Sequence, residues 1–263
     1  MIKKLFYSNH ILILFSNMQS HHYFLFSFCK KIATVFTLLL AFMVFLPDAV
    51  LAQEFDETDI RTDIVVALDV SAFMKGQDFE PTRLEAAKNA LMTFNETYPQ
   101  FRIGVIIVGE EAKTLIPLTA SDTFSIQSFN EKVKSVTVNT LQGTGTALGE
   151  ALDLAIKEYD AIGATNENLI LLSDGGDNEE PDILTNAVRL ARQKELKVFC
   201  VGIGTNQTVQ MLDANNNEIS VENTYQDKFL IKISELTGGS FFQANSTEEL
   251  NQILVQIGES IKK

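Results

Sequence analysis

Three short polar segments of this chain carry oxygen side chains close to strong secondary-structure signals. Asp69 is the last residue of the apolar run DIVVALD, and Ser71 lies two residues after it. Asp174 directly follows the apolar run NLILLS. Thr146 ends the loop GTGT, which precedes a helical pattern. Ligands of open α/β sheets bind outside the carboxyl ends of the strands, so we expect these side chains to meet at one sheet edge. Two carboxylates and two hydroxyls suit Mg²⁺ or Mn²⁺, which retain water ligands and leave a position open.

Other kinds of chemistry have few candidate residues. All three histidines lie within the first 22 residues, and the two cysteines are Cys29 and Cys200. Zinc centres and Cys/His catalytic sites are therefore hard to build. A serine hydrolase would need a base near Ser71, and no histidine follows residue 22. We expect the chain not to be an enzyme, with a hydrolase as the least favoured alternative.

Each acidic motif also has a plain structural interpretation. Asp69 or Asp174 alone would be read as a turn residue, because aspartate favours such positions. Their joint occurrence with the GTGT loop favours a site instead. The run Asp174–Asp182 has the acidic density of a calcium loop without its spacing or its closing glutamate.

Apolar runs rich in β-branched residues alternate with segments of helical period. Most of the runs are apolar throughout, as expected of strands buried on both faces. This pattern predicts an α/β fold with a doubly wound, mostly parallel six-stranded sheet and helices on both faces. The second and third runs are separated by a short segment containing Gly109, which predicts a hairpin and an antiparallel edge strand. The predicted strands are Asp63–Val70, Arg102–Val108, Lys113–Leu118, Asn168–Ser173, Lys197–Ile203 and Ser240–Ala244.

Helices are expected between these runs. Pro81 and Pro181 each mark a helix start, because proline is tolerated in the first turn. One stretch, Thr208–Tyr225, breaks the alternation and is expected to form a hairpin excursion. The other predicted helices are Ser121–Val133, Thr146–Tyr159, Asp227–Leu236 and Thr247–Ile261.

The N-terminal part of the chain has the layout of a secretory signal peptide. Two lysines precede the uncharged run Ile32–Leu46, and small residues lead to a cleavage point after Ala52. An uncleaved membrane anchor is the alternative, and Met18 is an alternative start. We therefore expect residues 1–52 to be a signal peptide or anchor and residues 53–263 to be one domain. The protein is expected to be exported, and either periplasmic or anchored to the inner membrane.

The chain is acidic, with 34 Asp and Glu against 21 Lys and Arg and a formal net charge of −13. Such a surface repels nucleic acid and anionic lipid, so nucleic acid is not an expected partner. Acidity that merely keeps an exported protein soluble is the simpler interpretation.

The motifs DVSAFM, GTGTALGEAL and LILLSDGGDN, in this order, resemble a von Willebrand factor type A domain with its metal-ion-dependent adhesion site. The resemblance spans Thr62–Ile261. The stretches DFEPTRLEAAKNAL, TLIPLTASD and KISELTGGSFFQANSTEELNQI further resemble the bacterial Bat family of aerotolerance-type proteins, which are often held in the inner membrane. The resemblance implies a doubly wound domain whose metal is completed by a carboxylate of a protein partner.

One position departs from the motif of this family. The family has a second serine where this chain has Phe73, which removes a hydroxyl ligand and adds an aromatic ring. We expect Mg²⁺ or Mn²⁺ binding by Asp69, Ser71, Thr146 and Asp174 to be weakened or lost. The predicted function is protein interaction in the cell envelope through this degenerate site. The alternative is a metal-independent structural subunit of an envelope complex.

Overall fold

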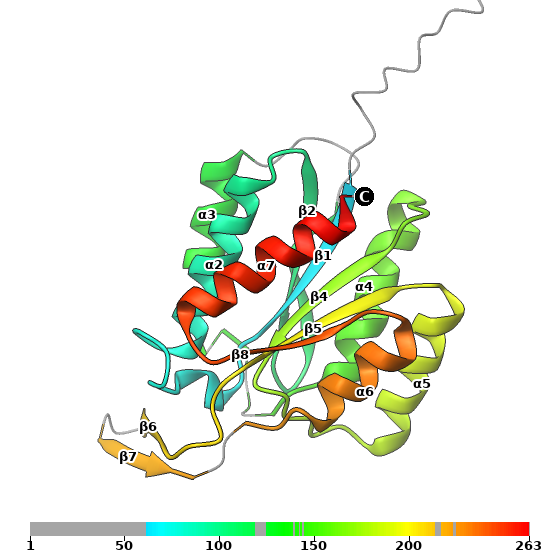
Figure 1. Cartoon of the computed structure of the whole chain (residues 1–263). Helices are drawn as coiled ribbons and strands as arrows, with labels where there is room; N and C mark the ends of the chain where they lie inside the picture. Colours follow the sequence, from blue (N-terminus) through cyan, green and yellow to red (C-terminus); the bar gives the residue numbers. More distant parts are fainter. Residues whose placement is uncertain are drawn as a thin grey trace, which may run out of the picture. The chain divides into compact units, whose positions relative to one another are not determined.

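A six-stranded sheet is the centre of the fold (Figure 1). The computed structural model describes residues 62–118, 125–138, 140–141, 143, 145–213, 217–222 and 225–262. The expected leader, residues 1–52, lies outside them. The strand order is β3-β2-β1-β4-β5-β8, and the predicted strands are confirmed to within two residues at each end. The strands are β1 (Thr62–Asp69), β2 (Phe101–Val108), β3 (Ala112–Ile116), β4 (Asn168–Ser173), β5 (Lys197–Ile203) and β8 (Phe241–Ala244).

The order of the strands places a topological switch point between β1 and β4. β1 pairs in parallel with β2 on one side and with β4 on the other. β5 and β8 continue the parallel sheet, and β3 is the predicted antiparallel edge strand. Open α/β sheets bind ligands at the carboxyl ends of the strands flanking such a point. Asp69 ends β1 and Asp174 directly follows β4, so both stand there.

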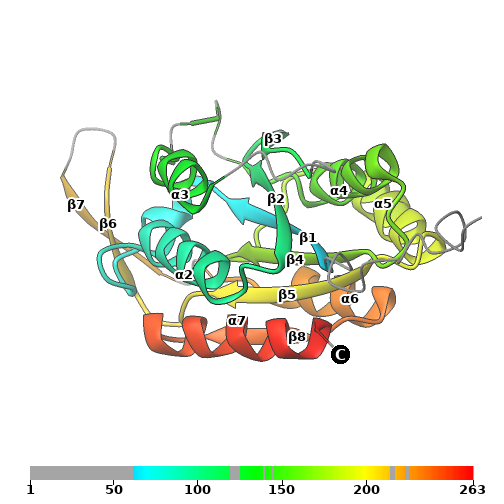
Figure 2. The same cartoon turned by 90° about the horizontal axis from the view of Figure 1, so that it is seen from above.

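Helices cover both faces of the sheet (Figure 2). Along β1 the side chains alternate, with Ile64 and Val66 in one apolar core and Val65 and Ala67 in the other. This alternation gives the sheet two apolar faces that need cover. The first core includes α2 (Arg83–Thr97), α3 (Ile126–Lys134) and α7 (Thr247–Ile261), and the second includes α4 (Leu148–Ile162), α5 (Pro181–Gln193) and α6 (Lys228–Thr237).

The starts of two helices differ from the prediction. Pro81 does not open α2, because Thr82 is the N-cap and its hydroxyl accepts the backbone N–H of Glu85 at 3.2 Å. α4 begins at Leu148 rather than Thr146, because the N–H of Ala147 donates to the carbonyl of Gly109. That bond holds the preceding residues in a loop.

Other predicted elements are found close to their expected places. Pro181 is the first residue of α5, as predicted. Ser125 caps α3, while residues 121–124 of the helix predicted there lie outside the described part of the chain. The excursion forms the two-stranded sheet of β6 (Val209–Leu212) and β7 (Glu218–Val221). Within the described ranges, no helix combines the length and the hydropathy that a membrane crossing requires.

A candidate metal site at the carboxyl edge of the sheet

Asp69 is held in place by its neighbours at the end of β1. Its side chain is fully buried; Oδ1 accepts the backbone N–H of Ser71 at 2.8 Å, and Oδ2 accepts the hydroxyl of Ser173 at 2.5 Å. Burial raises the pKa of Asp69, and the Ser173 hydrogen bond opposes that rise. The sequence did not single out Ser173, which looked like the last residue of an apolar strand. The structure identifies it as a residue that orients Asp69.

Asp174 is the second buried carboxylate, beside Asp69. Its Oδ1 accepts the N–H of Gly176 at 3.2 Å, whereas its Oδ2 has no hydrogen-bond partner. Burial, together with the charge of Asp69, raises the pKa of Asp174 to about 7. A cation bound beside Asp69 and Asp174 would reduce the electrostatic repulsion between their carboxylates.

Thr146 is brought to the same place by the loop that follows Asp174. The N–H of Thr146 donates to Oδ1 of Asn178, and the N–H of Asn178 donates to the carbonyl of Thr146, both at 3.0 Å. A Cβ on Gly176 would lie 3.6 Å from Oδ1 of Asp174 and 3.8 Å from Oγ1 of Thr146. The backbone of Gly176 therefore lies against both side chains, and both oxygens are close to one point.

Ser71 and Phe73, which follow Asp69 in the chain, differ in burial. Ser71 is buried, and its Oγ has no hydrogen-bond partner. Phe73 belongs to the short helix η3 (Ala72–Lys75) and is 40% exposed. The phenyl ring is therefore partly exposed to solvent and is not enclosed among the four oxygens.

A buried arginine that the sequence did not single out lies next to Asp174. The guanidinium of Arg83 pairs with Asp78 through Nε–Oδ1 and Nη2–Oδ2, both at 2.7 Å, and its Nη1 lies 3.9 Å from Oδ2 of Asp174. Gly204 makes room for it, because a Cβ there would lie 2.8 Å from Cζ of Arg83. The residue stands in the stretch PTRLEAAK, where its helical neighbours gave no sign of a buried charge.

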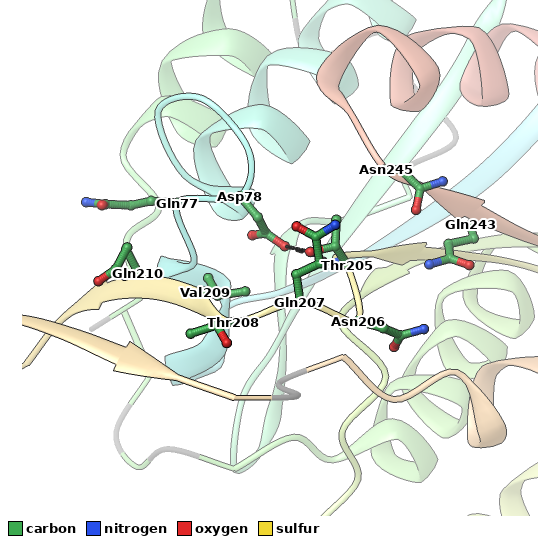
Figure 3. Close-up of a pocket in the computed structure, with 10 residues that line it drawn as sticks. All are labelled: Gln77, Asp78, Thr205, Asn206, Gln207, Thr208, Val209, Gln210, Gln243 and Asn245. Carbon is green, nitrogen blue, oxygen red and sulfur yellow. Dashed lines mark hydrogen bonds between the residues drawn. The ribbon is translucent and has the colours of Figure 1, made fainter.

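Asp78 joins the site to a polar cavity. Its Oδ2 also accepts the N–H and the hydroxyl of Thr205, at 3.0 and 3.2 Å. The cavity has a volume of about 800 Å³ and adjoins the ends of β5 and β8 (Figure 3). Its other lining residues are mostly carboxamides and hydroxyls: Gln77, Asn206, Gln207, Thr208, Val209, Gln210, Gln243 and Asn245.

The described residues fit a divalent cation on two counts. Ser71 Oγ and Asp174 Oδ2 are buried oxygens without a hydrogen-bond partner, as expected of atoms that could bind a ligand. The ionised forms of Asp69, Asp78 and Asp174 carry three negative charges against the single positive charge of Arg83, which leaves two for a divalent ion to neutralise. Within the described ranges, no three His, Cys, Asp or Glu side chains cluster as a metal group. A cation here would therefore depend on the hydroxyls and on water.

Comparison with known proteins agrees with this architecture. Residues 63–256 match the von Willebrand factor type A domain. Similar proteins include an uncharacterized protein of Borreliella burgdorferi, 27% identical over 188 residues, covering 70% of this chain and 54% of that protein. A UPF0353 protein of Mycolicibacterium vanbaalenii is 26% identical over 216 residues, covering 76% of this chain and 61% of that protein. The chain thus spans less than two thirds of these relatives.

Solved structures of similar fold include two proteins from Bacteroides. An aerotolerance-related membrane protein of Bacteroides fragilis has a TM-score of 0.64 at 20% identity, covering 76% of this chain and 98% of that one. BatB of Bacteroides thetaiotaomicron has a TM-score of 0.64 at 23% identity, covering 77% and 100%. Proximal thread matrix protein 1 from mussel byssus, solved with a zinc-occupied MIDAS motif, has a TM-score of 0.53 at 17% identity, covering 76% and 47%. By its match over most of its length, this chain belongs to the von Willebrand factor type A domain family.

Proposed function

We propose that this protein is an interaction module of the cell envelope that captures a protein partner through a divalent cation. Asp69, Ser71, Thr146 and Asp174 would hold Mg²⁺ or Mn²⁺. The bound ion would supply an open coordination position for a carboxylate of the partner. In this proposal the protein acts by binding, without catalysis.

One observation carries the proposal. Ser71 Oγ and Asp174 Oδ2 belong to segments about a hundred residues apart, and both are buried without a hydrogen-bond partner at the same sheet edge. Leaving a buried polar atom unsatisfied costs about 1–3 kcal/mol, and more for a charged group. A bound cation would offset that cost.

Each protein residue has a distinct part in this function. Ser173 fixes the rotamer of Asp69, and Asn178 ties Thr146 to the loop that bears Asp174. Arg83 neutralises part of the negative charge of the site when no metal ion is bound, and this keeps the affinity for the metal ion moderate. The site is thereby suited to reversible capture.

The envelope location is part of the proposal. It is supported by the signal-peptide layout of residues 1–52 and by the likeness in fold to an aerotolerance-related membrane protein of Bacteroides fragilis. Export to the periplasm and anchoring by the N-terminal segment are both compatible with this layout.

Capture from solubilised envelope proteins tests the function. The full chain is immobilised in Mg²⁺ or in a chelator, and the bound proteins are identified. We expect one partner to be retained only in Mg²⁺, and to be lost with Asp69→Ala and Thr146→Ala. Retention of the same partner by both variants and in chelator would instead establish a metal-independent structural subunit.

A further inference from the structure

The loop before α2 and the chain that follows β5 form two walls of the polar cavity beside Asp78 (Figure 3). Hydrogen bonds join the two walls. Asp78 accepts the N–H and the hydroxyl of Thr205, and the N–H of Gln77 donates to the carbonyl of Gln210 at 3.0 Å. The volume of about 800 Å³ falls within the roughly 300–1,000 Å³ that is typical of binding pockets. Because the walls are already held in place, a ligand would spend little free energy on ordering them.

The lining of this cavity is polar and almost uncharged. Of the described residues that form it, six have carboxamide side chains, two are threonines, and the others are Val209 and Asp78. Both carboxylate oxygens of Asp78 already accept hydrogen bonds from Arg83. Carboxamides and hydroxyls each provide donors and an acceptor. The cavity therefore offers mixed hydrogen-bonding groups without a free charge, in a chain whose formal net charge is −13.

This lining is unfavourable to several classes of ligand. An anion would lose its hydration here, and the described lining has no lysine or arginine to compensate for that loss. A cation would find the carboxylate of Asp78 already paired with Arg83. An apolar ligand, or an apolar segment of a protein, would meet a single aliphatic side chain in the described lining, Val209, which is only 2% exposed.

We propose that this cavity binds a neutral saccharide. Each hydroxyl of a sugar can donate and accept a hydrogen bond, which matches the carboxamide and threonine side chains of the lining. Asn206, Gln207 and Thr208 are exposed, so a ligand can reach their polar groups from solvent. Recognition rests on uncharged hydrogen bonds that replace those made to water, so the affinity is expected to be modest, in the millimolar range.

This site goes beyond the proposed metal-dependent capture and does not require it. The lining contains none of the four proposed metal ligands. Saccharide binding is therefore expected to persist in a chelator.

The test is an NMR titration of the full chain in EDTA with two neutral trisaccharides, maltotriose and triacetylchitotriose, each raised to tens of millimolar. Trigalacturonate serves as an anionic trisaccharide, and triserine with blocked ends serves as a neutral peptide. We expect at least one neutral trisaccharide to shift the side-chain amide signals of Asn206 and Gln207. Trigalacturonate should bind about tenfold more weakly or not at all, because the lining offers it no positive charge.

Gln207→Met keeps the length of the side chain and removes its polar atoms, so it should weaken trisaccharide binding about fivefold. Gln256→Met is the matched control, because Gln256 is exposed on α7 and lies outside the lining. It should leave binding unchanged.

The absence of shifts with both neutral trisaccharides would overturn the proposal, and so would equal binding of trigalacturonate or of blocked triserine. Equal effects of the two methionine variants would also contradict it. Asp69→Ala should retain trisaccharide binding while losing any response to Mg²⁺, which separates failure of the cavity from failure of the metal site.

Discussion

Nη1 of Arg83 lies 3.9 Å from Oδ2 of Asp174, and neither atom has a hydrogen-bond partner. The rest of the guanidinium is bound to Asp78 in a bidentate pair. Arg83 therefore approaches Asp174 without satisfying it. Asp174 is therefore available to a metal ion in addition to Arg83. We expect the guanidinium of Arg83 and the metal ion to compete for this carboxylate.

Arg83→Met should make the protein less stable and more dependent on divalent cations. The change leaves Asp78 without its partner, so the free energy of unfolding in EDTA should fall by about 3–5 kcal/mol. Mg²⁺ should restore more stability to the variant than it adds to the unmodified protein, because a competing positive charge is gone. Urea denaturation with and without Mg²⁺ measures both effects.

Arg102→Met is the control for this prediction. Arg102 makes the same bidentate pair with Asp63, at 2.6 Å for both bonds, but is partly exposed and pairs near the start of β1. Its loss should cost about 1–3 kcal/mol, because Asp63 loses its partner, and should give no extra response to Mg²⁺. Equal gains from Mg²⁺ in the two variants would show that Arg83 does not influence the metal site.

The raised pKa of Asp174 predicts that stability depends on pH. The folded protein holds this proton up to a pKa of about 7, whereas the unfolded chain loses it near 3.8. The folded state thus binds more protons between these values, so stability in EDTA should fall as pH rises from about 4 to 7. Asp174→Asn should flatten this fall. Mg²⁺ should counteract it increasingly toward pH 7, because the ion binds the ionised form.

A pH series of denaturation curves, in EDTA and in Mg²⁺, measures this dependence. A slope between pH 4 and 7 that is identical in Asp174→Asn would assign the dependence to other groups.

Ser173→Ala should weaken metal binding, although Ser173 is not itself a proposed ligand. The hydroxyl donates to Oδ2 of Asp69 and accepts the N–H of Gly175 at 2.9 Å, so its removal frees the carboxylate to rotate. Affinity for Mg²⁺ should fall about tenfold, as is typical for residues that orient metal ligands. Ser234→Ala removes another buried hydroxyl, which donates to the carbonyl of Ile231 in α6, and should leave the affinity unchanged. Calorimetry with Mg²⁺ distinguishes the two, and equal affinities would argue against a role for Ser173.

Phe73→Ser should strengthen metal binding. The exposed ring is replaced by the hydroxyl that the family motif has at this position, and affinity for Mg²⁺ should rise about tenfold. Phe73→Ala removes the ring and supplies no hydroxyl, so it should have little effect. If the alanine variant gains as much as the serine variant, the ring itself limits binding in the natural chain.

The sheet was predictable because its strands are apolar on both faces. Runs such as NLILLS have no helical period, and the observed bounds of β4 and β5 are those predicted. The rule that ligands of open α/β sheets lie outside the carboxyl ends of the strands placed Asp69 and Asp174 at one edge, where the structure has them as neighbours. The switch point between β1 and β4 came from the observed strand order.

The charge balance of the site was not predictable from the sequence. Arg83 and Asp174 are 91 residues apart, and they meet where the start of α2 lies near the end of β4. The exposure of Phe73 depends on the geometry of η3, which the motif alone does not specify. Ser173 was hidden because a serine at the end of an apolar strand has no periodic signature.

The most direct test of the metal site is the paramagnetic broadening of amide signals by Mn²⁺ at sub-stoichiometric concentration. The proposal predicts that Ser71, Thr146 and Gly176 broaden first, that signals near Asp63 at the opposite edge stay sharp, and that Asp69→Ala abolishes the effect. Broadening that is uniform, that is centred on another acidic segment, or that persists unchanged in Asp69→Ala would contradict a cation at this edge of the sheet.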